Sequence, residues 1–500
     1  MEHATTTDGV ATPAAGCPVD HGAMTAAAPV DQPVAAEPVA SAPPARRPAM
    51  PATALPGPRM HVLRQIRKYW KHQYAFMAEN RRLYGPRFTL TVRIPPAPIY
   101  ILSDPDDLKE LFTAPPDVIH TGLGSSMLEK FTGQTGLAWL DEDEHKSRRK
   151  VLMPSMHGKA FRRIESNIDG IAELELAKWP IGRPFSLHPR VQIITLNVIR
   201  EVIFGAKVPA RWNELLEVLN GMLDFNDKFA STIMIHRMSP RAVKVLRAIR
   251  PLGMDKFLRL RERADALLAE AVRERLDSGV AGDDMLGVLL ASKDRNGEPL
   301  GGTELRDEMM TIFLAGNETT TSGIARGLEI LSREREVHDR LRAEIDAGES
   351  DAYLTATVYE ILRMHSPLPQ VIAREVMKPI EIGGVQYQPG DILAPSAYLL
   401  HNDPAYYPEP ERFQPERFLD VKPNMYTWIP FGGGRTRCLG DKIGIAEMKS
   451  VLRKVVSQFD LVRESPEPEG TRSRLILSVP EKGGRIALRP RARAASLTGA

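Results

Sequence analysis

The ten residues from Phe431 to Gly440, Phe-Gly-Gly-Gly-Arg-Thr-Arg-Cys-Leu-Gly, constrain this chain more than any other stretch. They contain Cys438, one of only two cysteines in 500 residues; the other is Cys17. Apolar residues at helical spacing follow, so Cys438 is predicted to stand at the start of a helix. The free N–H groups and dipole of a helix start, with Arg435 and Arg437 beside them, favour a thiolate. We therefore interpret Cys438 as a thiolate ligand rather than an inert buried cysteine.

Glycines lie on both sides of this cysteine, at Gly432, Gly433, Gly434 and Gly440. They remove side chains and would let the backbone approach a flat ligand closely. With only two thiols, a disulfide framework and a multi-cysteine zinc or iron–sulfur site are both excluded.

The stretch resembles the haem-binding loop of the cytochrome P-450 family, whose pattern is F-x-x-G-x-R-x-C-x-G. Phe431, Gly434, Cys438 and Gly440 fit this pattern, while Thr436 replaces the arginine. The resemblance implies a mainly α fold with small β-sheets (α+β), with a long central helix over the haem and the cysteine loop before the last long helix. It also implies haem b, with iron held by Cys438. Further cofactor contacts are then expected from Phe431, Gly432, Ala315, Arg437 and Gly440.

A second motif, Ala315-Gly-Asn-Glu-Thr-Thr320, lies within the predicted long helix from Thr303 to Leu331. Glycine inside a helix is unfavourable, so Gly316 indicates either tight helix packing or space beside a cofactor. The segment is similar to the family's A/G-G-x-D/E-T-T motif. By that resemblance Thr319 is the oxygen-binding hydroxyl, and Glu318 is the acid of a proton relay.

A third set of residues is expected to be structural. Glu360-x-x-Arg363 resembles the family's E-x-x-R helix, and Pro415-Glu-Arg417-Phe supplies the expected downstream arginine. Taken alone, such a Glu–Arg spacing is common and usually marks an exposed helical ion pair. In this order we predict a charge network of Glu360, Arg363 and Arg417 that supports the cysteine loop.

Two cationic elements are expected to bind the haem propionates. His145 and Arg149 lie four residues apart on a charged helix, which by itself suits a surface charge cluster. The resemblance assigns them, together with Arg374 after Pro367-Leu-Pro369, to the propionates. The arginine fork is well suited to carboxylates.

The domain plan follows from composition and periodicity. Residues 1–57 are rich in Ala, Pro and Thr and are predicted to be disordered. Residues 58–490 form the predicted haem domain, with a tail at 491–500. Helices are expected within residues 62–84, 141–153, 159–178, 190–205, 211–223, 241–248, 253–278, 334–346, 351–364 and 438–459. Residues 474–489 are expected to form a hairpin around Gly483-Gly484.

Charge and hydropathy limit the partners. The net charge is only +3, which gives no argument for nucleic acid. No run of 18 apolar residues or secretory signal is recognised, so we expect no transmembrane segment and a cytoplasmic location. About sixty residues follow Cys438, so electrons are expected from NAD(P)H through a separate ferredoxin or flavodoxin-type donor. Its predicted docking face comprises Arg435, Arg437, Lys442, Lys449 and Arg453.

The predicted activity is a haem-thiolate monooxygenase that uses dioxygen to hydroxylate or epoxidise a small apolar organic substrate. Alternatives are a peroxide-driven peroxygenase or haem isomerase, and a non-catalytic haem or ligand sensor. Pocket walls are expected from residues 115–138, 211–250, 312–320, 367–372 and 475–479. Their apolar lining is predicted to include Ile312, Phe313, Leu368, Val371, Ile372, Leu475 and Ile476.

Overall fold

The computed structural model describes residues 49–491 except 93–96, 123–127, 226–253, 281, 295–296 and 475. Its α-helices are α1 (Val62–Lys71), α2 (Gln73–Tyr84), α3 (Pro105–Thr113), α4 (Glu129–Thr132), α5 (Glu142–Met156), α6 (Gly158–Leu176), α7 (His188–Phe204), α8 (Trp212–Phe225), α11 (Met254–Asp277), α12 (Met285–Leu290), α13 (Gly302–Leu331), α14 (Arg335–Ala347), α15 (Ala352–Met364), α16 (Ala397–His401) and α17 (Asp441–Gln458). Short 3-10 turns are η1 (Ala52–Ala54), η3 (Leu137–Trp139), η5 (Pro415–Phe418) and η6 (Gly434–Thr436).

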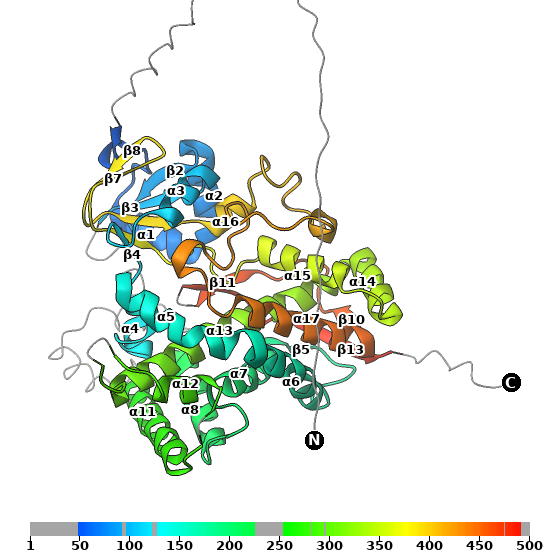
Figure 1. Ribbon diagram of the computed structural model, residues 1–500. Coiled ribbons are helices and arrows are strands. Elements are labelled where there is room, and N and C mark those ends of the chain that lie inside the picture. The colour runs from blue at the N-terminus through cyan, green and yellow to red at the C-terminus, as the bar shows by residue number, and fades with distance from the viewer. Residues whose placement is uncertain are drawn as a thin grey trace, which may run out of the picture. The chain divides into compact units, whose positions relative to one another are not determined.

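The strands are short and gather into small sheets. They are β1 (Met50–Pro51), β2 (Arg87–Leu90), β3 (Ile99–Leu102), β4 (Ile119–His120), β5 (Phe185–Ser186), β6 (Arg374–Val376), β7 (Ile380–Ile382), β8 (Val385–Tyr387), β9 (Ile392–Pro395), β10 (Phe459–Arg463), β11 (Thr471–Arg474), β12 (Leu477–Pro480) and β13 (Arg485–Pro490). The largest sheet has the order β2-β3-β9-β6-β4. It lies with α1, α2, α3 and α16, apart from the helices that surround α13 (Figure 1).

Helix α13 is the central element. It has 30 residues, and most of its side chains are buried, so neighbouring helices must cover it on several sides. It packs against α7, α17, α4, α11 and α15 (Figure 1). Glu304 Oε2 accepts a hydrogen bond from Gly301 N at 3.0 Å, which satisfies one of the free amides at the helix start. The main apolar core lies along α13, between α6, α7, α15 and α17.

The last strands differ from the predicted hairpin. β12 pairs with β11, whereas β13 pairs with β10 and β5 in another sheet. Gly483 and Gly484 do form a turn with positive φ, as their sequence indicates. However, a Cβ atom at Gly484 would lie 2.7 Å from the Ala325 carbonyl of α13, so this turn is packed against the helix. The prediction was wrong because a turn signal does not say with which strands its two arms pair.

The folded domain begins earlier than residue 58. Met50 and Pro51 pair in parallel with Val385 and Gln386 of β8, and the adjacent Ala52 is buried. Residues 1–48 of the predicted disordered tail lie outside the described residues. So do the predicted helix 241–248 and nearly all of the C-terminal tail. The first predicted helix is divided into α1 and α2 by His72, whose backbone is not helical.

Candidate active site

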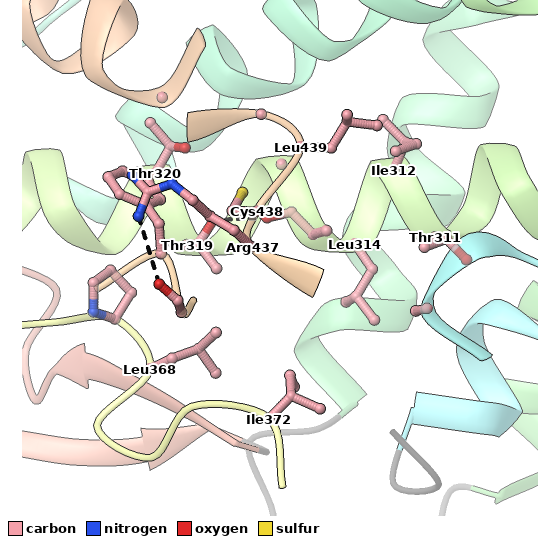
Figure 2. A pocket seen from close by; sticks show the side chains of 18 of the residues that line it. Thr311, Ile312, Leu314, Thr319, Thr320, Leu368, Ile372, Arg437, Cys438 and Leu439 are labelled. Atoms are coloured by element: carbon pink, nitrogen blue, oxygen red, sulfur yellow. Dashed lines mark hydrogen bonds between the residues drawn. The ribbon is translucent and has the colours of Figure 1, made fainter. Parts of the chain in front are cut away.

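One large cavity brings the sequence motifs together. Its volume is about 340 Å³, and it lies between α5, α7, α13, the residues before β6 and the cysteine loop. Figure 2 shows Cys438, Thr319, Leu368 and Ile372 around this space. The wall contains the predicted residues Cys438, His145, Arg149, Arg374, Phe431, Gly432, Arg437, Gly440, Ala315 and Thr319.

The backbone of the loop holds the Cys438 thiol at the cavity. Cys438 N donates to Phe431 O at 2.9 Å, and α17 begins three residues later, at Asp441, rather than at the cysteine. The Cys438 side chain is exposed to the cavity, but the protein packed around it desolvates the thiol and raises its pKa, although the Gly440 N–H, Arg437 and Arg149 act to lower it. The expected effect of the helix start is therefore outweighed by desolvation. A cation bound at the thiol would favour the thiolate.

The glycines of the loop serve two purposes. Gly432 and Gly440 line the cavity, in agreement with the expected close approach of a ligand, and Gly432 has a φ of +67°. Gly433 and Gly434 instead pack against α3. Added Cβ atoms would lie 2.2 Å from the Phe112 ring and 2.1 Å from its carbonyl oxygen, respectively. The sequence interpretation was therefore wrong in assigning these two glycines to the ligand.

Three basic side chains line the cavity without an ion pair to a carboxylate among the described residues. Arg374 is 3% exposed and donates to Ile372 O and, at 3.0 Å, to Thr436 Oγ1. Burial lowers the pKa of Arg374 to about 10. Burial, followed by the charge of Arg149, lowers the pKa of His145 to about 4. Burial also lowers the pKa of Arg149.

The two arginines on either side of Thr436 have different surroundings. Arg435 points away from the cavity and donates to the Ala114 carbonyl at 2.9 Å and to the Ile119 carbonyl. Arg437 lies at the cavity wall, where Asp441 balances its charge at 3.0 Å. Thr436 stands where the family pattern has an arginine. Its Oγ1 accepts a hydrogen bond from Arg374 and so contacts this basic residue of the cavity wall.

These features fit a haem group. The cavity offers one thiol, glycine backbone at Gly432 and Gly440, an apolar wall, two arginines without anionic partners among the described residues, and a histidine that could become charged beside an anion. Haem has a flat apolar ring, an iron that accepts thiolate and two carboxylates, so its parts complement each of these features. Cys438 would hold the iron, and His145, Arg149 and Arg374 would hold the propionates.

The α13 motif is split between the cavity and the core. Ala315 and Thr319 line the cavity, and Thr319 Oγ1 donates to Ala315 O at 2.6 Å. Gly316 also faces the cavity. A Cβ atom there would lie 2.2 Å from Ile199 Cδ1 of α7, so tight helix packing also requires this glycine.

Glu318 is not brought to the cavity. Its buried carboxylate accepts from Arg474 Nη1 at 2.8 Å, and Oε1 lies 2.9 Å from His188 Nε2. Burial raises its pKa, but His188 and Arg474 together outweigh this effect, so the pKa of Glu318 is lowered. The pairing of hydroxyl and carboxylate expected from adjacent positions is therefore absent, because successive helix residues point about 100° apart.

Glu360, Arg363 and Arg417 lie together, outside the cavity. Arg363 Nε donates to Glu360 Oε2 at 2.7 Å and Nη2 donates to Oε1 at 2.8 Å, with both side chains fully buried. Arg417 Nε lies 3.4 Å from Glu360 Oε1. Arg363 also donates to the carbonyls of His401 and Pro410, at 2.8 Å each. The cluster thus ties α15 to the chain segment that precedes the cysteine loop.

The wall differs in part from the sequence expectation. Ile199 and Val202 of α7 line the cavity, whereas none of the described residues of α8 does. Phe313 faces the core instead, stacked on Trp212 with ring centroids 6.0 Å apart.

Glu447 of α17 also lines the cavity, and burial raises its pKa to about 8. It was missed because a glutamate in an amphipathic helix is normally solvent-exposed. Leu475 lies outside the described residues.

The comparisons with known proteins agree with this geometry. The cytochrome P450 family model matches residues 51–487. A putative cytochrome P450 135B1 of Mycobacterium tuberculosis is 33% identical over 444 residues, which cover 87% of this chain and 91% of the relative. A putative cytochrome P450 137 of the same species is 32% identical and covers 82% and 84%.

Solved structures show the same fold. A retinoic acid bound cyanobacterial CYP120A1 has a TM-score of 0.73 at 24% identity and covers 85% of this chain and 96% of its own. The cytochrome P450DA heme domain has a TM-score of 0.74 at 21% identity, with coverages of 89% and 99%. The predicted mainly α fold with small sheets is thereby confirmed. No helix in the described part of the chain is long and apolar enough to cross a membrane. This chain belongs to the cytochrome P450 family of haem monooxygenases.

Proposed function

We propose that this protein uses dioxygen and electrons from a separate donor to hydroxylate or epoxidise a neutral, apolar organic substrate. The observation that carries this proposal is that the Cys438 thiol and the Thr319 hydroxyl line the same largely apolar cavity. Haem b held by Cys438 would supply the redox chemistry that activates dioxygen. The protein would supply substrate orientation and protons.

Thr319 is the proposed hydroxyl at the oxygen site. Its Oγ1 donates to Ala315 O at 2.6 Å, so the hydroxyl of this cavity-lining residue can still accept a hydrogen bond. Glu318 is the proposed acid of the relay. Because Arg474 and His188 hold its carboxylate, it must leave at least one of them before it can pass a proton toward Thr319.

The substrate class follows from what the lining lacks. The basic lining residues His145, Arg149 and Arg374 are assigned to the propionates, and Arg437 is paired with Asp441. No other Arg, Lys or His is found among the described lining residues. Binding therefore depends on apolar contact, which suits a lipid, terpenoid, steroid or macrolide-like molecule. The apolar wall comprises Leu128, Leu137, Ile199, Val202, Ile312, Leu314, Leu368, Val371, Ile372 and Ile476.

The proposed docking face for a ferredoxin or flavodoxin-type donor, which would relay electrons from NAD(P)H, is smaller than the sequence indicates. Lys449 and Arg453 share one carboxylate, that of Asp351, at 3.1 and 2.6 Å, so their combined charge is reduced. Arg435 and Arg437 are held by carbonyl groups and by Asp441. Arg435 and Lys442 form no ion pair among the described residues, and of these two only Arg435 is held by backbone carbonyls. Reversing the charge of Lys442 should slow reduction by the donor, and unchanged reduction rates would exclude this face.

The proposal is tested by spectra and by oxygen coupling. Reduced wild-type protein should give the thiolate-type Soret band with carbon monoxide, and Cys438→Ala should lose it. Thr319→Ala should still consume dioxygen, but with most of the electrons diverted from product to peroxide or water. A Cys438→Ala protein that kept the thiolate band would overturn the assignment.

One observation favours a second candidate. The carboxylate of Glu318 is directed away from the cavity, as would suit a peroxide-driven peroxygenase that needs no relay acid. Turnover with peroxide, but none with dioxygen and a reductase, would place this second function first. A non-catalytic haem sensor would instead show ligand binding with no turnover in either assay.

A further inference from the structure

Residues 128–139 form one wall of the cavity and are held by α13. Leu128, Leu137 and Ala138 line the cavity. Between α4 and η3, residues 133–136 have no helix or strand of their own. Their position therefore depends on contacts with neighbouring elements.

Asp307 of α13 supplies the first of these contacts. Its buried Oδ2 accepts hydrogen bonds from Gln134 N at 2.9 Å, Thr135 N at 3.0 Å and Thr135 Oγ1 at 2.8 Å. Its Oδ1 lies 2.6 Å from Arg306 Nε. Bonds to an ionised acceptor are roughly twice as strong as neutral ones, so this side chain fixes two consecutive amides.

Glu308 supplies the second contact, on the next residue of the helix. Its fully buried Oε2 accepts from Leu137 N at 3.0 Å and from Arg148 Nη1 at 3.1 Å. Arg148 also pairs with Glu304 at 2.8 Å. Oε1 of Glu308 has no hydrogen-bond donor among the described residues. Burial raises the pKa of Glu308 to about 7, although Arg148 acts to lower it.

Two glycines allow this close approach. Gly133 has a φ of +77°, and an added Cβ atom would lie 2.1 Å from the Asp307 carboxylate. At Gly136 a Cβ atom would lie 2.6 Å from Thr311 Oγ1. The backbone is therefore seated directly on α13, one turn before Ile312 and Ala315 reach the cavity.

We propose that Asp307 and Glu308 are positioning residues for the substrate. Their carboxylates fix the backbone of residues 134–137 and thereby set Leu137 and Ala138 in the cavity wall. This inference rests on the proposed function, since it names what determines the shape of the same apolar site. Neither acid lines the cavity itself, so both act through the wall.

The test uses the full-length, haem-loaded protein with Asp307→Asn and Thr135→Val. Glu304→Gln is the matched control, because it removes a neighbouring acid of α13 whose partners are Arg148 and Gly301 N rather than the backbone of residues 133–137. Amide hydrogen exchange of residues 133–139 reports the wall. Spectral titration with imidazole and with the bulky azole clotrimazole reports the space beside the iron.

We expect Asp307→Asn to speed amide exchange at Gln134 and Thr135. The same change should lower the affinity for clotrimazole about tenfold and alter the affinity for imidazole by no more than about twofold. Thr135→Val should cause a smaller change in the same direction, and Glu304→Gln should leave both readouts unchanged. Unchanged exchange, or equal weakening of both azoles, would overturn the proposal. Neither readout requires turnover, so a wild-type protein without monooxygenase activity would count against the proposed function instead.

Discussion

Two buried groups of charges in this molecule are balanced in opposite ways. At α15, Glu360 faces Arg363 at 2.7 Å and Arg417 at 3.4 Å, and backbone carbonyls take up the remaining donors of Arg363. At the cavity, Arg374 and Arg149 form no ion pair with a carboxylate among the described residues. The charges of the first group are paired by acids of the protein itself, whereas those of the second group are not.

The difference indicates what each group is for. Buried charges are tolerated only when they are paired, so a self-paired cluster supports the fold and an unpaired one indicates a missing ligand. Both groups lie close to the cysteine loop in sequence or in space. The charge balance, rather than burial, therefore separates the arginines of the α15 cluster from those proposed to bind the cofactor.

The largest expected effect is on the self-paired cluster. Glu360→Ala leaves Arg363 and Arg417 without their acid and should reduce the unfolding free energy by about 3–5 kcal/mol. Chemical unfolding of the haem-loaded protein measures it. Arg412→Ala, which breaks only the exposed pair with Glu409, should change it by less than about 1 kcal/mol. Similar losses in both variants would contradict this interpretation of the α15 cluster.

The cavity cations should respond in the opposite sense. Arg374→Ala should leave the haem-free protein as stable as the wild type, because an unpaired buried charge is removed. The same change should release haem about tenfold to a hundredfold faster, as expected for a lost charge-assisted hydrogen bond. Transfer of haem to excess apomyoglobin measures this rate. Arg435→Ala is the control from the same loop and should lower stability with little effect on haem release.

The third prediction concerns pH. The pKa of His145 falls from about 6.5 in the unfolded chain to about 4 in the haem-free fold, so the unfolded chain binds more protons between these values. Lowering the pH from 7 to 5 should therefore destabilise the haem-free protein by up to about 2 kcal/mol through this group.

Urea unfolding at several pH values checks this effect, and His145→Gln should remove it. Haem binding would give His145 an anionic neighbour, so the difference between wild type and variant should shrink in the haem-loaded protein. Parallel stability curves for the two haem-free proteins would show that His145 is not held neutral by burial.

The smallest effect is expected at Thr436. Thr436→Val removes the hydrogen bond to Arg374 and should cost about 1 kcal/mol of haem affinity, seen as several-fold faster haem release. Thr436→Ser keeps the hydroxyl and should behave like the wild type. If valine and serine have the same effect, the threonine does not orient Arg374.

Much of the candidate site could be predicted from the sequence. Cys438, Thr319, His145, Arg149 and Arg374 all reach one cavity, although they come from distant parts of the chain. This was possible because each lies in a short stretch that resembles a motif of the cytochrome P450 family. The long central helix was predicted to within one residue at its start, since periodic apolar residues over many turns leave little ambiguity.

The features that the sequence did not predict depend on the direction in which side chains point and on contacts with remote segments of the chain. Helical periodicity did not say that Phe313 faces Trp212 while Ile199 of α7 faces the cavity. Glu318 was expected beside Thr319, but Arg474 from β11 and His188 from the start of α7 draw its carboxylate away. Residues that come from remote segments cannot be identified from a local pattern.

The sequence by itself determined most of the long helices through their apolar periodicity, and its resemblance to known motifs indicated the family and the role of Cys438, because periodicity and short motifs are local. Only the tertiary structure decided the electrostatics. Desolvation raises the pKa of the Cys438 thiol against the influence of nearby positive charge, and Asp307 and Glu308 meet the backbone of a cavity wall. Desolvation and long-range pairing arise only when segments far apart in the chain exclude water together.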